Sequence, residues 1–143
     1  MSKLGRYAAQ RRKVQELTAA YTVTVADCGT EFFLNSATEF AVTLPNASDA
    51  GQGWWARFIV VAAPASADYT IVATDDDDDN IHGVVLTGED SSADADKTAG
   101  TGTDVITFAD GKAKQGDFVD IMTDGTNWYV WGAASEHDGI TYT

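Results

Sequence analysis

The sequence predicts an all-β domain, a sandwich or jelly-roll-like fold of about ten short strands, preceded by a short N-terminal helix or arm. Short runs rich in Val, Ile, Thr, Phe, Tyr and Trp recur about every ten residues, with turn-forming residues between them and no second helical pattern. At 143 residues the chain has room for one hydrophobic core. We expect residues 1–19 to form the arm and residues 20–143 to form the β-domain.

The N-terminal segment has a helical pattern. Its apolar side chains recur every three to four residues, and good helix formers occupy most positions from 8 to 17. A helix of this length is marginal alone in water, and Gly5 weakens it by about 1 kcal/mol, so we expect it to order on a partner or on the body. The apolar stripe consists of Leu4, Tyr7, Ala8, Val14 and Leu17.

The rest of the chain changes to the period of two that β-strands require. Asp124 and Gly125 accept a positive φ together and therefore predict a tight turn within a C-terminal hairpin. Residues 91–103 are rich in Ala, Asp, Thr and Gly, a composition that buries little surface, so we expect a mobile loop there. The expected strands cover residues 21–25, 31–35, 39–44, 54–62, 69–74, 81–87, 105–108, 118–122, 128–131 and 140–142.

Charge is segregated along the chain. Residues 1–16 hold five basic and one acidic side chains, a net charge of +4, whereas the whole chain has a net charge of −13, so the remainder carries −17. Such an acidic body repels phosphates, which argues against nucleic acid as a partner. We expect no membrane helix, because the longest apolar run has six residues (58–63) where about twenty are needed. Cys28 is the only cysteine, which excludes an intrachain disulfide.

Two segments place large aromatic residues on both faces of a strand. Trp128 and Tyr129 are neighbours, as are Trp54 and Trp55, and neighbouring strand residues point in opposite directions. A sandwich buries one face of each sheet, so the second aromatic face is covered either by loops of the chain itself or by another subunit. A sugar-binding platform is a further alternative, since aromatic rings stack on sugars. The residues assigned to a subunit interface are Trp54, Trp55, Tyr129 and Trp131.

Few residues suggest chemistry. Residues 75–79 are consecutive aspartates; Asp75, Asp77 and Asp79 offer oxygen ligands to a cation, but a coordination loop needs ligands spaced so that they converge. We therefore prefer a solvated loop tip to a metal site. No nucleophile elbow, phosphate-binding loop, dinucleotide glycine pattern or metal-ligating His and Cys spacing is present. We expect no enzymatic activity, no catalytic residues and no cofactor, with a hidden pair of catalytic carboxylates as the alternative.

A series of short phrases in the sequence resembles a module found in virion proteins of tailed bacteriophages, including capsid decoration proteins, head fibres and tail-fibre segments. The resemblance covers residues 20–143, apart from the aspartate run and residues 91–103, which look like local elaborations. The phrases are residues 21–30, 33–36, 40–45, 50–54, 58–61, 69–72, 116–119 and 123–130.

This resemblance implies a β-sandwich that typically forms a homotrimer and has no catalytic residues. Because only about twenty residues precede the module, in place of a fibre shaft, we expect a capsid decoration (cement) protein that binds the outer surface of the major capsid protein and stabilises the head. It would be made in the host bacterial cytoplasm and lie on the capsid exterior of the virion. The alternative is a receptor-binding or carbohydrate-binding knob of a head fibre or tail fibre. The residues expected to contact the capsid are Lys3, Leu4, Arg6, Tyr7, Arg11, Arg12, Lys13, Val14 and Leu17.

Overall fold

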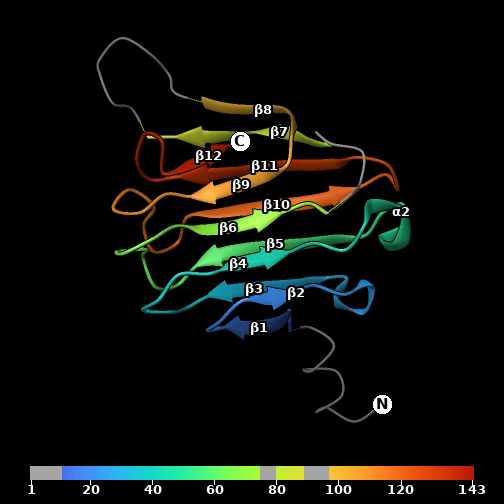
Figure 1. Cartoon of the computed structure of the whole chain (residues 1–143), viewed down its shortest axis with the longest axis horizontal. Helices are drawn as coiled ribbons and strands as arrows, with labels where there is room; N and C mark the ends of the chain where they lie inside the picture. Colours follow the sequence, from blue (N-terminus) through green and yellow to red (C-terminus); the bar gives the residue numbers. More distant parts are fainter. Residues whose placement is uncertain (1–10, 75–79, 89–96) are drawn as a thin grey trace.

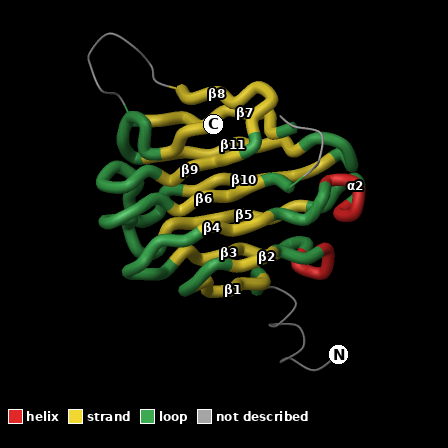
Figure 2. Tube along the Cα trace, in the orientation of Figure 1, coloured by secondary structure: helices red, strands yellow, loops and turns green. Residues whose placement is uncertain are grey.

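Two β-sheets lie face to face in the computed structural model of the chain, which describes residues 11–74, 80–88 and 97–143 (Figure 1). The predicted all-β sandwich is confirmed. Two short helical turns, η1 (Val25–Asp27) and α2 (Ala47–Ala50), lie at the same end of the strands (Figure 2). Among the described residues, no helix has the length and apolar character needed to cross a bilayer.

The larger sheet has seven strands and the smaller has five. In spatial order the larger sheet contains β1 (Lys13–Leu17), β3 (Thr30–Leu34), β5 (Trp55–Val60), β10 (Phe118–Thr123), β11 (Trp128–Ala134), β7 (Ile81–Thr87) and β8 (Lys97–Thr103). The smaller sheet contains β12 (Ile140–Tyr142), β9 (Val105–Phe108), β6 (Tyr69–Val72), β4 (Ala41–Thr43) and β2 (Tyr21–Thr22).

From β1 to β6 the chain crosses from one sheet to the other after every strand. Strands two apart in sequence therefore run in the same direction and pair in parallel: β1 with β3 and β3 with β5 in the larger sheet, β2 with β4 and β4 with β6 in the smaller. The hairpin of β10 and β11 then enters the larger sheet between β5 and β7. The chain therefore winds between the two sheets from β1 to β6, and the β10–β11 hairpin later fills the position between β5 and β7 in the larger sheet.

Alternation along the strands fills the space between the sheets with apolar side chains. Phe32 and Phe58 stack with their ring centroids 5.0 Å apart, and Trp54 meets Trp128 edge to face at 5.5 Å. The largest fully buried side chains are Trp128, Tyr69, Phe32, Phe58, Phe108, Leu34, Leu44, Ile71, Ile81, Ile106, Ile121 and Ile140. Strands β3, β5, β10 and β11 of the larger sheet therefore each have one face in the core.

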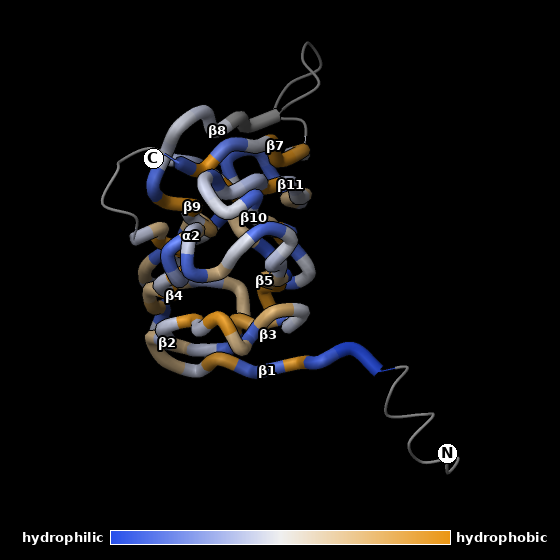
Figure 3. The backbone as a smooth tube through the Cα atoms, turned by 90° about the vertical axis from the view of Figure 1, so that its right-hand side faces the viewer, coloured by the Kyte–Doolittle hydropathy of each residue, from blue (hydrophilic) through white to orange (hydrophobic). Residues whose placement is uncertain are grey.

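The helix expected up to Leu17 is wrong for its last part, because residues 13–17 form strand β1. This segment pairs in parallel with β3 and gains a ladder of backbone hydrogen bonds at the edge of the larger sheet, where a short isolated helix would be marginal. Figure 3 shows the described chain leaving the body beside β1 as a hydrophilic segment. Residues 1–10 lie outside the described residues, and the remainder of the expected helix lies with them.

The loop expected at residues 91–103 is wrong from residue 97 onward, because residues 97–103 form the edge strand β8 paired with β7. Small residues are needed in part of this strand. A Cβ on Gly100 would lie 2.7 Å from the ring of Tyr142, so the glycine lets β12 pack against β8. Composition did not predict this strand, because glycine and alanine are depleted in strands generally.

The carboxylate of Asp27 holds the chain segment that leads into β3. It accepts hydrogen bonds from the Thr24 backbone N–H (2.8 Å), the Thr24 hydroxyl (2.9 Å) and the Tyr21 hydroxyl (3.2 Å). Burial raises the pKa of Asp27, but the hydrogen bonds from Thr24 and Tyr21, together with the charge of Lys13, outweigh it and leave the pKa below its usual 3.8.

We expect Asp27→Asn to lower the melting temperature near neutral pH, because the ionised form is bound more tightly in the folded state. Since the pKa of Asp27 is depressed on folding, its contribution is fully present above pH 3.8 and is lost as the pH falls through the folded value. Melting curves of both proteins between pH 7 and pH 2 measure this. A deficit that stayed constant over the whole range would show that the carboxylate charge contributes nothing.

Candidate contact surface

The outer face of the larger sheet is the side turned away from the smaller sheet, and it carries exposed aromatic residues. On β11, Trp128 is fully buried while Tyr129 and Trp131 are 44% and 56% exposed. Trp54 is buried and its neighbour Trp55 is 42% exposed. The predicted division of these aromatics between two faces is therefore confirmed.

Strand register brings the exposed aromatics of β5 and β11 together across β10. Met122 lies opposite Trp55 on one side and Tyr129 on the other, so the three side chains form a row across the outer face. The backbone of Gly29, at φ +78°, lies beneath the Trp55 indole, and a Cβ there would be 3.7 Å from the ring. An apolar strip thus crosses three strands from different parts of the chain.

The turn of the hairpin orients Tyr129. Its hydroxyl donates a hydrogen bond to Asp124 Oδ2 (3.0 Å), while Asp124 Oδ1 accepts the backbone N–H groups of Asn127 and Thr126, each at 2.8 Å. The backbone hydrogen bond from Asn127, then that from Thr126, keep the pKa of Asp124 below its usual value. The ring is thereby tied to the turn that sets the register of the hairpin.

Beside the apolar strip lies a row of charged side chains. Arg57 forms a bidentate pair with Asp120, through Nε to Oδ1 at 2.5 Å and Nη2 to Oδ2 at 2.7 Å. Its Nη1 lies 3.8 Å from Glu31 Oε1, which also pairs with Arg12. The hydrogen bond to Asp120 raises the pKa of Arg57 despite its partial burial. Two positive and two negative groups therefore compensate each other on this face.

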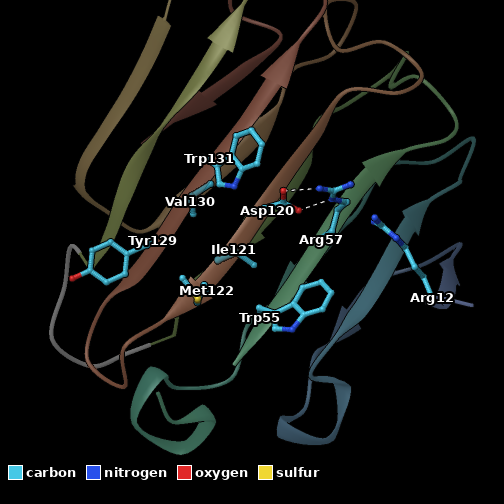
Figure 4. A pocket seen from close by; sticks show the side chains of 9 residues that line it. All are labelled: Arg12, Trp55, Arg57, Asp120, Ile121, Met122, Tyr129, Val130 and Trp131. Carbon is cyan, nitrogen blue, oxygen red and sulfur yellow. Dashed lines mark hydrogen bonds and ion pairs between the residues drawn. The ribbon is translucent and has the colours of Figure 1, made fainter. Parts of the chain in front are cut away.

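A groove of 670 Å³ lies over β5, β10 and β11 between the projecting rings (Figure 4). Trp131, Asp120 and Arg57 lie in one row across the three strands. Tyr129, Met122 and Trp55 lie in the neighbouring row. The guanidinium of Arg57 is also 4.8 Å from the centroid of the Phe118 ring. The lining of the groove accordingly combines aromatic rings with charged side chains.

The contact groups of this groove are aromatic rings, aliphatic side chains and paired charges. Its charged groups are committed to each other, and its lining includes no serine, cysteine or histidine beside a base. Within residues 11–74, 80–88 and 97–143, no group of three His, Cys, Asp or Glu side chains is placed to hold a metal ion. The candidate cation ligands Asp75, Asp77 and Asp79 lie outside these residues.

The structure corrects one member of the predicted interface. Trp55, Tyr129 and Trp131 all lie on the outer face, but Trp54 is 3% exposed and belongs to the core. Its Nε1 donates a hydrogen bond to the carbonyl of Val25 at 2.9 Å, which satisfies its polar atom inside the fold. Trp54 directly precedes β5, so it points to the opposite side of the sheet from Trp55, the first residue of the strand.

The structure also divides the residues expected to contact a capsid. Because β1 is a strand, Val14 and Leu17 lie on opposite faces: Val14 is exposed on the outer face and Leu17 is buried. Arg12 pairs with Glu31, and Lys13 lies 3.9 Å from Asp27 Oδ1. Leu17 therefore belongs to the core, which is a correction. Arg12 and Lys13 pair with the body but keep exposed side chains, so their contact with a capsid stays a prediction. Arg11 is exposed, while Lys3, Leu4, Arg6 and Tyr7 lie outside the described residues.

The sequence-based prediction of this surface did not include the charged residues of the groove, although strand alternation could have placed them on the same face as the aromatic residues. Arg57 is the one charged residue in β5 and stands two positions after Trp55, so alternation places both on one face. Asp120 likewise stands two positions before Met122 in β10, so alternation places these two on one face as well. Comparisons of the chain with protein-family models, with curated proteins and with solved structures find no match.

Proposed function

We propose that this chain is a structural virion protein, a capsid decoration protein that binds the outer surface of the major capsid protein and stabilises the phage head. The observation that carries the proposal is the outer face, which presents exposed aromatic rings around charged groups that already compensate each other. Exposed apolar patches rimmed by polar residues mark sites of contact with other proteins. The protein acts by adhesion and not by turnover.

Charge segregation supports the choice of a capsid as the partner. The basic N-terminal residues precede an acidic body of net charge −17, and Arg11 is exposed where the described chain begins, at the edge strand β1. A basic segment is attracted to an acidic patch on a shell, and complementary charge steers such an encounter. The arm would make the first contact, and the sandwich would remain outside as a rigid body.

We expect Lys3→Glu with Arg6→Glu to weaken binding to phage heads, because the substitutions remove the net positive charge of residues 1–16 and leave β1 intact. The measurement is cosedimentation with expanded heads that lack the protein, at 0.1 M and 1 M salt. Wild-type binding should loosen in part at high salt, since the Debye length falls from about 10 Å to about 3 Å.

The matched control is Lys112→Glu with Lys114→Glu, which changes the net charge by the same amount. Both side chains are exposed and pair with Asp138 and Glu136 beyond the larger sheet. This control should bind heads like the wild type if the arm is the anchor. Equal loss of binding in both variants would show that only the overall charge matters, and wild-type occupancy of the arm variant would remove the arm from the proposal.

A carbohydrate-binding knob is the second candidate, and the groove itself favours it. Trp55, Tyr129 and Trp131 line it with aromatic rings, and Arg57 and Asp120 offer hydrogen-bonding groups beside Trp131. Aromatic stacking combined with planar polar groups suits a sugar ring. The groove residues, however, already satisfy each other, so a sugar would have to compete with the bidentate ion pair.

A further inference from the structure

We infer that the outer face of the larger sheet binds a second copy of this chain, with Trp131 of each copy entering the groove of another. The inference deepens the proposed function, because it takes the outer face as a contact surface and names what covers it.

The first argument is where exposed apolar side chains gather. Eight large apolar side chains are exposed in the described part of the chain, and seven of them lie on the outer face; Val25 in η1 is the exception. Such a concentration on one face is unusual for a protein that remains alone in water. The seven are Val14, Trp55, Val84, Leu86, Met122, Tyr129 and Trp131.

The distribution of charge on the outer face indicates that its partner is a second copy of this chain. Two copies of a chain with a net charge of −13 repel each other over most of their surfaces. Across the central row of the outer face the charges cancel, since Arg57 pairs with Asp120 and Arg12 pairs with Glu31. Two copies can therefore approach on this face without bringing uncompensated like charges together. A strongly cationic partner would be drawn instead to the acidic surfaces elsewhere on the body.

Shape is the third argument, because a projection and a hollow occur side by side. Trp131 projects from β11, is 56% exposed, and is braced edge to face against Phe118 with ring centroids 5.9 Å apart. The 670 Å³ groove opens next to it over β5 and β10. A surface that carries both parts is complementary to itself, as closed homo-oligomers require.

Forming this contact costs little side-chain conformational entropy, because several of its side chains are already held in place. The guanidinium of Arg57 is fixed by Asp120 and lies against Phe118, and Tyr129 is held by Asp124. Side chains fixed before binding lose less conformational freedom when the interface forms. Burying the Arg57–Asp120 pair also leaves neither charge without its partner, which is the condition under which an ion pair is tolerated at an interface.

The test is light scattering of the full chain at micromolar concentration. The expected mass is two or three times the 15.2 kDa of one chain. Trp131→Ala should raise the dissociation constant at least about 30-fold, as expected for a central aromatic of an interface. Trp131→Glu should abolish assembly, since it would bury a charge. Val25→Ala, at the exposed apolar residue outside this face, should assemble like the wild type.

Each alternative has its own result. A wild-type mass of one subunit overturns the inference, as does undiminished assembly of Trp131→Glu that melts like the wild type. If the protein is monomeric and host polysaccharide quenches its tryptophan fluorescence, the face is a carbohydrate site. Head cosedimentation separates the two proposals: a monomer that still binds heads sinks only the inference, and an oligomer that does not bind heads sinks only the proposed function.

Discussion

Trp128→Ala is expected to lower the free energy of unfolding by about 3–5 kcal/mol, the range for removing a large aromatic side chain from a core. Trp128 is fully buried between the sheets and packs edge to face on Trp54, so its removal leaves a cavity that neighbouring strands cannot fill. Urea unfolding followed by circular dichroism measures the change. Because association adds to apparent stability, all proteins should be compared at a concentration low enough for them to be single subunits.

Trp131→Ala is the matched control for this change. It removes the same side chain from the same strand, three positions along and on the opposite face. In a single subunit it should cost far less stability, because the ring is more than half exposed. Equal losses at positions 128 and 131 would contradict the assignment of one indole to the core and the other to the outer face.

Gly83→Ala is expected to destabilise the larger sheet by about 3 kcal/mol or more, at the upper end of the cost of overpacking. A Cβ at position 83 would lie 1.8 Å from the carbonyl oxygen of Val130, which is backbone and cannot move aside as a flexible side chain would. The parallel pairing of β7 with β11 must therefore shift or break. Thermal unfolding measures the loss, and hydrogen exchange should rise first in β7 and β8.

A control separates this clash from the general effect of replacing glycine. Gly111 has φ +70° and a Cβ there would meet nothing within 4 Å, so Gly111→Ala should cost only the backbone strain, about 1 kcal/mol. If Gly83→Ala melted at the same temperature as Gly111→Ala, the close approach of β7 to β11 would be wrong.

The sequence predicted those features that depend on neighbouring residues. Period-two alternation identified most strands and divided Trp128 from Tyr129 and Trp54 from Trp55, because side-chain direction in a strand follows from position alone. It did not show which adjacent tryptophan faced the core. That choice depends on the strands packed against them.

The errors share a physical origin in pairing between distant segments. Residues 13–17 have a helical pattern, but pairing with β3 supplies hydrogen bonds that outweigh local preference. Residues 97–103 lack strand-forming composition, yet β7 pairs with them. Arg57 and Asp120 are 63 residues apart, so no local pattern could join them in one ion pair.

The place of the β10–β11 hairpin in the larger sheet has a consequence for folding. Strands β5 and β7 do not pair with each other; their partners at the centre of the sheet, β10 and β11, come later in the chain. While the polypeptide emerges from the ribosome, the facing edges of β5 and β7 stay unpaired and open to other chains. Pairing between strands that are far apart in the sequence is slow. The larger sheet therefore stays divided until the β10–β11 hairpin has been synthesised and has paired with both edges.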